Sequence, residues 1–217
     1  MRRLLLAPLL CALGCASGPS APPPDNYLRY VSFEVGIHDH VLLHWRKRDM
    51  PLRVYLPFPK EYQFKDPEAV HDAVRDGILD WTDVAGPGIP SFTFVDTAEE
   101  ADIPIFWEKE SKGWFIASCS YSREVLHRHF KVDRILVTAR EADGREARLE
   151  DVYTTVLHEM GHALGLGGHS PNKADVMYPW RQQSRRLTTL SPRDRETLRL
   201  LYQRPVGQPI SSPRSVR

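Results

Sequence analysis

The sequence predicts a single α+β domain in which a mixed sheet is backed by helices, and three observations support this. Segments with strand and helix periodicity follow one another in the order strand, helix, several strands, helix, helix. The 217 residues, 41% of them hydrophobic, are enough for one catalytic-sized core and too few for two ordinary domains. Eighteen prolines argue against a helical bundle, and three cysteines cannot form a disulfide framework. The net charge of +1 is too small for the protein to bind a nucleic acid through its overall charge, so we expect no nucleic-acid partner.

Residues 1–15 predict a signal peptide. A short basic start precedes an apolar run, residues 4–13, which is too short to span a bilayer but fits the hydrophobic part of a secretory leader. The run ends in Ala-Leu-Gly before Cys15, which resembles the lipobox of bacterial lipoproteins, where the cysteine is acylated. The alternative is ordinary cleavage near Ala16 or Gly18. In both cases we expect an extracytoplasmic protein, either secreted or held at the cell envelope only by its lipid anchor.

The composition of the two ends of the mature chain predicts segments outside the folded domain. Residues 16–27 are rich in proline and predict a tether, and residues 203–217 combine Pro, Gly, Ser and Arg and predict a disordered tail. The folded domain is therefore expected to span residues 28–202.

Each element of that domain has a local signal. The expected strands are residues 52–56, 92–95, 103–107, 114–121 and 134–138. A first helix begins after Asp66, an N-cap residue, with Pro67 at the first helical position, and it ends before Gly86. A second helix covers about residues 150–164, and a third opens at Ser191.

The second helix carries the chemistry. His158 and His162 are four residues apart, so they lie on one face of the helix, one turn from each other. An apolar stripe is centred on the other side and consists of Leu149, Val152, Tyr153, Val156, Met160, Ala163 and Leu164. The helix therefore packs its apolar side on the core and presents two imidazoles. With Glu159 they form HExxH, which supplies two zinc ligands and a glutamate placed to act on a water molecule.

The residues after this helix extend the motif. Gly165 and His169 follow, and then the run Asp-Val-Met-Tyr-Pro with Met177 at its centre. This resembles the metzincin zinc metalloproteases, in particular the matrixin branch, and the start of the third helix at Ser191 is similar to the matrixin C-terminal helix. The resemblance covers about residues 45–202. It implies a twisted, mixed five-stranded sheet with about three helices, and zinc in a cleft between an upper and a lower part.

The resemblance also implies roles for individual residues. His158, His162 and His169 would bind one catalytic zinc, Glu159 would be the general base, and Met177 would lie in a tight turn beneath the metal. One departure is that three residues, not two, separate Gly165 from the third histidine. We expect the Gly167-Gly168 pair to absorb the extra residue as a bulge, because glycine takes backbone angles closed to other residues.

Two other residues remain candidates for the third ligand, namely Glu196 and Asp175. With three neutral imidazoles, zinc keeps its full charge and an open position for water, and Glu159 can move the proton from that water to the departing amine. The ligand set thus implies a monomeric zinc-dependent endopeptidase acting on proteins or peptides. The substrate is expected to pair with an edge strand, which we assign to residues 114–121.

The alternative function is a catalytically weak zinc-binding envelope protein that binds a partner, against which Glu159 argues because a binding module needs no base. Other chemically reactive side chains are interpreted as structural or solvated. Cys119 is a packing residue in a strand, and no Asp-rich loop indicates the calcium that matrixins often bind. The surface histidines are His38, His40, His127 and His129, and the charged-loop arginines are Arg181, Arg185 and Arg186.

Overall fold

The computed structural model of the chain describes residues 26–35, 39–62, 64–109, 116–124, 129–141, 143–179 and 189–210. The predicted leader, residues 16–25 of the predicted tether and residues 211–217 of the predicted tail lie outside this part of the chain. So do Cys15, His38, Trp114, His127, Arg181, Arg185 and Arg186. None of the helices among the described residues combines the length and the apolar character that crossing a membrane requires.

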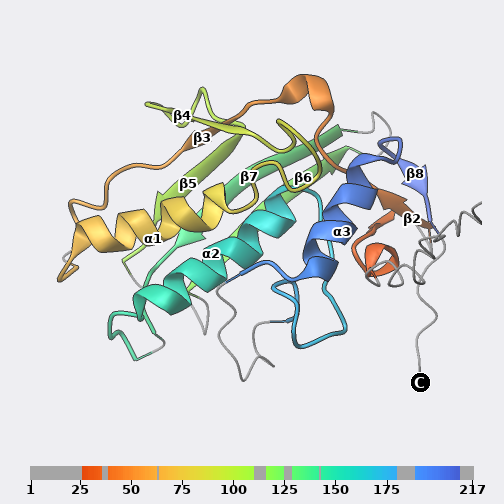
Figure 1. Cartoon of the computed structure of the whole chain (residues 1–217). Helices are drawn as coiled ribbons and strands as arrows, with labels where there is room; N and C mark the ends of the chain where they lie inside the picture. Colours follow the sequence, from red (N-terminus) through yellow and green to blue (C-terminus); the bar gives the residue numbers. More distant parts are fainter. Residues whose placement is uncertain are drawn as a thin grey trace, which may run out of the picture.

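A mixed five-stranded sheet forms the main layer of the fold (Figure 1). Its strands have the spatial order β4-β3-β5-β7-β6, in which β6 is antiparallel to β7 and the other pairs are parallel. The strands are β3 (Leu52–Tyr55), β4 (Phe92–Val95), β5 (Ile103–Trp107), β6 (Ala117–Glu124) and β7 (His129–Val137). The predicted mixed five-stranded sheet is confirmed.

Strands β6 and β7 differ in their bounds from the prediction of residues 114–121 and 134–138. Their antiparallel pairing continues through the pairs Ser122–Lys131 and Arg123–Phe130, past a register shift after Ser120. The extension of β7 alternates as a strand should, with Phe130 and Val132 buried and Lys131 and Asp133 exposed, so the predicted start at residue 134 was too late. Strand β6 occupies one edge of the sheet.

Two helices cover one face of this sheet. Helices α1 (Pro67–Leu79) and α2 (Leu149–Ala163) run side by side beneath the strands (Figure 1). Helix α1 begins as predicted, because Asp66 Oδ1 accepts a hydrogen bond from the Ala69 N–H at 2.9 Å. After α1 the fully buried Trp81 donates its indole N–H to the Leu157 carbonyl at 2.9 Å and thereby ties the two helices together.

The third helix, α3 (Pro192–Tyr202), begins with a capping box in which Ser191 and Asp194 bond to each other's backbone N–H groups. It packs beside η1 (Leu28–Tyr30), a single 3₁₀ turn near the start of the described chain. A second 3₁₀ turn, η2 (Lys47–Asp49), leads into β3. With three α-helices among the described residues, the predicted α+β class is confirmed.

A second, three-stranded sheet was not predicted. It has the order β1-β2-β8 and consists of β1 (Phe33–Val35), β2 (Asp39–Leu42) and β8 (Gln208–Pro209). Strands of two to four residues leave too little sequence for a period of two to be recognised.

The domain is therefore longer than the predicted residues 28–202. Tyr27, the last residue of the predicted tether, is fully buried. Residues 203–210 of the predicted disordered tail return to the small sheet, where the Gly207 N–H donates to the Leu42 carbonyl at 2.7 Å. Their proline and glycine content suggested a loose tail, but the segment is fixed by long-range backbone hydrogen bonds that composition does not reveal.

Candidate active site

Helix α2 is buried on almost every side. Val152, Val156 and Met160 are fully buried in the core, as the apolar stripe predicted. The first member of the stripe, Leu149, is 43% exposed, which corrects the prediction for the first helical turn. It follows directly on the exposed Arg148, where the chain enters the helix from the surface.

His158 and His162 are both buried and both anchored through Nδ1. His158 Nδ1 lies 2.7 Å from the Val176 carbonyl oxygen, and His162 Nδ1 lies 2.6 Å from that of Leu166. Because a carbonyl oxygen can only accept, each Nδ1 carries the proton and each Nε2 keeps a free lone pair. This is the arrangement found in metal-binding histidines, whose second nitrogen is held by an outer hydrogen bond.

The chain leaves α2 at Gly165, whose φ of +106° is open to glycine and strained for other residues. Neither Gly167 nor Gly168 has a positive φ, so the predicted reason for this pair is wrong. Both glycines are needed for close packing instead. A Cβ on Gly167 would lie 2.6 Å from the Phe33 ring, and one on Gly168 would overlap the Tyr30 carbonyl oxygen.

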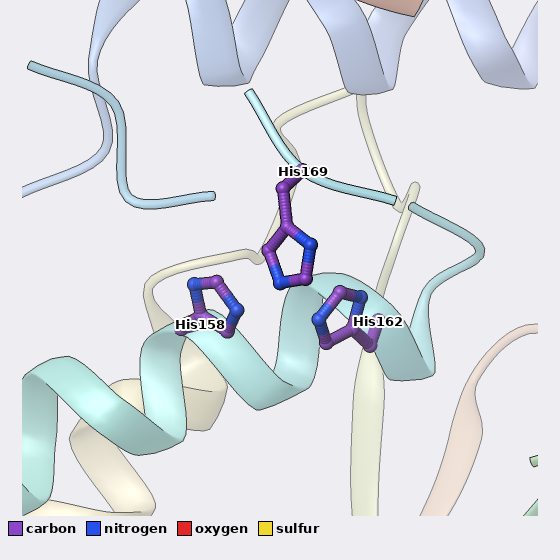
Figure 2. A group of neighbouring side chains, drawn as sticks. All are labelled: His158, His162 and His169. Carbon is purple, nitrogen blue, oxygen red and sulfur yellow. The ribbon is translucent and has the colours of Figure 1, made fainter. Parts of the chain in front are cut away.

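This loop brings His169 to the other two imidazoles. Figure 2 shows it pointing from the loop toward the pair on the helix, and its ring centroid lies 5.2 Å from that of His158 and 5.0 Å from that of His162. One potential ligand atom from each of the three histidines lies within 4.8 Å of the others. Among the described residues, no other group of three or more His, Cys, Asp and Glu side chains is placed to hold a metal ion.

The other two candidates for the third ligand are engaged elsewhere. Asp175 is fully buried and accepts hydrogen bonds from Ser170, Ser191 and Arg193. Glu196 lies on α3 and pairs with Arg199 at 2.6 Å. The structure therefore groups His169, and neither carboxylate, with the two helix histidines.

Glu159 lies between His158 and His162 in the sequence and contacts the edge of the sheet. Its Oε2 accepts a hydrogen bond from the Cys119 backbone N–H on β6 at 2.7 Å. The helix that carries the imidazoles and the edge strand thus meet at this carboxylate.

A comparison with protein-family models matches residues 44–203, well over half of the chain, to the matrixin peptidases. This chain belongs to the matrixin family. A search of curated proteins found no match. Matrixins are zinc-dependent metallopeptidases of the metzincin type, so this protein is a metalloprotease that acts on proteins or peptides. The donor set of the matrixin fits zinc, because three imidazoles converge and the two on the helix have their Nε2 lone pairs free.

Burial favours the neutral form of the two helix imidazoles of the matrixin. It lowers the pKa of His158 from 6.5 to about 4, and it moves the pKa of His162 well below its ordinary value. The pKa of His169 is also lowered by burial. A proton and a metal ion compete for the same lone pair, so lowered pKa values favour metal binding.

Burial has the opposite effect on the two acids beside the site. It raises the pKa of Glu159 to about 8, although the hydrogen bond from Cys119 favours the carboxylate. It also raises the pKa of the Cys119 thiol, as does the nearby charge of Glu159. Cys119 packs half-buried against the core, in line with its interpretation as a packing residue.

Met177 is fully buried below the helix, at the position where the resemblance expects the methionine turn. Its sulfur fills the space next to Gly161, where any Cβ would overlap it. Asp194 holds this turn from α3, since its carboxylate accepts from the Val176 N–H at 2.9 Å and from the Tyr27 hydroxyl at 2.5 Å. Asp194 was not among the predicted site residues, and its local sequence signal is the Ser-x-x-Asp spacing of the capping box that it forms with Ser191.

Proposed function

We propose that this matrixin is a zinc endopeptidase in which His158, His162 and His169 hold the metal and Glu159 is the general base. The observation that carries the proposal is the convergence of three imidazoles on a helix whose Glu159 carboxylate is anchored to an edge strand. Zinc bound there would act as a Lewis acid on the scissile carbonyl and lower the pKa of a water molecule toward about 7.

Glu159 is suited to proton transfer in both directions. Without metal its pKa is about 8, and a nearby cation would lower that value and favour the carboxylate that accepts a proton. The Cys119 N–H fixes one carboxylate oxygen, and the other can take a proton from the attacking water and deliver it to the departing amine. Met177 takes no part in this chemistry and supports the imidazoles from below.

We further propose that the substrate pairs with β6. This strand lies at an edge of the sheet, and its Cys119 N–H contacts the proposed base, so a peptide along it would pass the site. A photoreactive peptide substrate should crosslink to residues 117–124. Crosslinking to β4, the opposite edge, would contradict this assignment.

The test of the enzyme is zinc analysis combined with cleavage of an unfolded protein. Wild type should bind one zinc per chain and cleave in a chelator-sensitive manner, and Glu159→Gln should bind zinc without cleaving. Glu146→Gln is the matched control, because Glu146 also accepts a backbone N–H, from Lys65, outside the site. Stoichiometric zinc with no cleavage by wild type would instead support the zinc-binding envelope protein that binds a partner.

We also propose, from the leader sequence, that the protein is an extracytoplasmic lipoprotein acylated at Cys15 and that the mature chain is a monomer. Mass analysis of the mature N-terminus should show a diacylated or triacylated cysteine. An unmodified terminus beyond Ala16 would refute the lipid anchor and leave secretion, and light scattering tests the monomer.

A further inference from the structure

Residues 27–33 precede the part of the chain that matches the matrixin family, which starts at residue 44. They are nevertheless part of the core: Tyr27 and Val31 are fully buried, and Phe33 is 2% exposed. This segment contacts both of the loops that orient the three imidazoles.

The first contact reaches His158 through a chain of hydrogen bonds. The Tyr27 hydroxyl donates to Asp194 Oδ1 at 2.5 Å, and Asp194 Oδ2 accepts from the Val176 N–H at 2.9 Å. The carbonyl of the same residue, Val176, accepts the Nδ1 proton of His158. Tyr27 thus supports, through Asp194, the residue whose carbonyl fixes the ring of one imidazole.

The second contact reaches His162 and His169 through the glycine loop. The Gly167 N–H donates to the Val31 carbonyl at 2.9 Å, directly after Leu166, whose carbonyl holds His162. Gly168, which directly precedes His169, lies so close to the Tyr30 carbonyl that no side chain fits between them. The loop therefore packs closely against residues 30–33 at Gly167 and Gly168, directly before His169.

From these contacts we infer that residues 27–33 are a positioning element of the metal centre: through Val176, Leu166 and Gly168 they set the orientation of all three imidazoles. The inference rests on the ligand set proposed above. Outer hydrogen-bond partners of metal-binding histidines fix the direction of the Nε2 lone pair, and their loss lowers metal affinity by about 10- to 100-fold. Tyr27 acts one step further out, so we expect an effect near the lower end of that range.

The test compares Tyr27→Phe with Tyr153→Phe. Both variants remove a tyrosine hydroxyl that donates to a carboxylate, Asp194 in the first case and Asp80 in the second. Tyr153 lies on the helix that carries His158 and His162, and its hydroxyl donates to Asp80 at the end of α1. If residues 27–33 only stabilise the fold, the two variants should behave alike toward metal.

Two readouts are used, neither of which requires activity. The zinc dissociation constant is measured by competition with a chromophoric chelator, and the visible absorption spectrum is recorded after loading with Co²⁺. Tyr27→Phe should weaken zinc binding about tenfold and change the Co²⁺ spectrum, whereas Tyr153→Phe should leave both within twofold of wild type. Equal values for the two variants would overturn the inference.

Gly168→Ala provides an independent variant on the second path. The added methyl must displace either Tyr30 or the loop before His169, so it should also weaken zinc binding and alter the Co²⁺ spectrum. Wild-type affinity in this variant would refute the second path. Failure of wild type to bind zinc would refute the ligand assignment, and the inference with it. Wild type that binds zinc, together with variants of equal affinity, would refute the inference alone.

Discussion

The burial of His158 has a measurable consequence for the metal-free protein. The folded state holds the pKa of this imidazole at about 4, and an ordinary histidine titrates at 6.5, so the unfolded chain takes up more protons between these pH values. The stability that neutral His158 contributes is complete above about pH 6.5 and is lost as the pH falls. With about 1.4 kcal/mol per pKa unit, the loss from this residue at about pH 5 is about 2 kcal/mol.

The assay is urea unfolding of chelator-treated protein at about pH 7 and about pH 5, for wild type and for His158→Gln. The glutamine amide does not titrate, so the variant should lose about 2 kcal/mol less than wild type over this interval. Other groups titrate in both proteins, and the comparison removes their contribution. If wild type and His158→Gln lose the same stability, burial does not disfavour the imidazolium at this position and the account of the neutral ligand set is wrong.

Three further predictions concern the same site and its support. Glu159→Gln should raise the urea midpoint of the metal-free protein at about pH 7, because burial raises the pKa of Glu159 to about 8 and ionisation there opposes folding; an unchanged or lower midpoint would contradict this. Zinc at about a hundred times its dissociation constant should add about 2.7 kcal/mol, so calorimetry with and without chelator should differ by about 5–10 °C, and equal midpoints would argue against a metal site in the native fold. Asp175→Asn removes the charge of a fully buried aspartate that pairs with the partly exposed Arg193 and should cost about 3 kcal/mol in urea unfolding, against less than about 1 kcal/mol for Asp102→Asn in the surface pair with Arg53; similar losses would refute the distinction.

The features that could be predicted from the sequence are those set by residues close together in the chain. Asp66 and Pro67 mark the start of α1 because a cap and a fixed φ act within one helical turn. The four-residue spacing places His158 and His162 on one face whatever surrounds the helix. The family resemblance added His169, which no local period could have assigned.

What the sequence did not predict depends on contacts between distant residues. Tyr27 and Asp194 are 167 positions apart, and no pattern within either segment indicates that they bond. Strand β8 likewise forms only by pairing with β2, which lies far away in the sequence. Leu149 differs, because its spacing places it on the apolar stripe, but the first turn of the helix lies at the surface and leaves this side chain 43% exposed.

The extra residue after Gly165 and residues 27–33 are best understood together. The family spacing has two residues between the glycine and the third histidine, and a longer loop would by itself have more freedom to move His169 away from the helix. Here that freedom is removed on both sides of the loop, since the Leu166 carbonyl is bound by His162 and the Gly167 N–H by Val31. The glycines allow this contact because they have no side chain to hold the two segments apart. Residues 30–33, which lie outside the family match, therefore hold the loop that contains the extra residue, and a deletion of one glycine of the pair, which restores the family spacing, should make zinc binding less dependent on this contact.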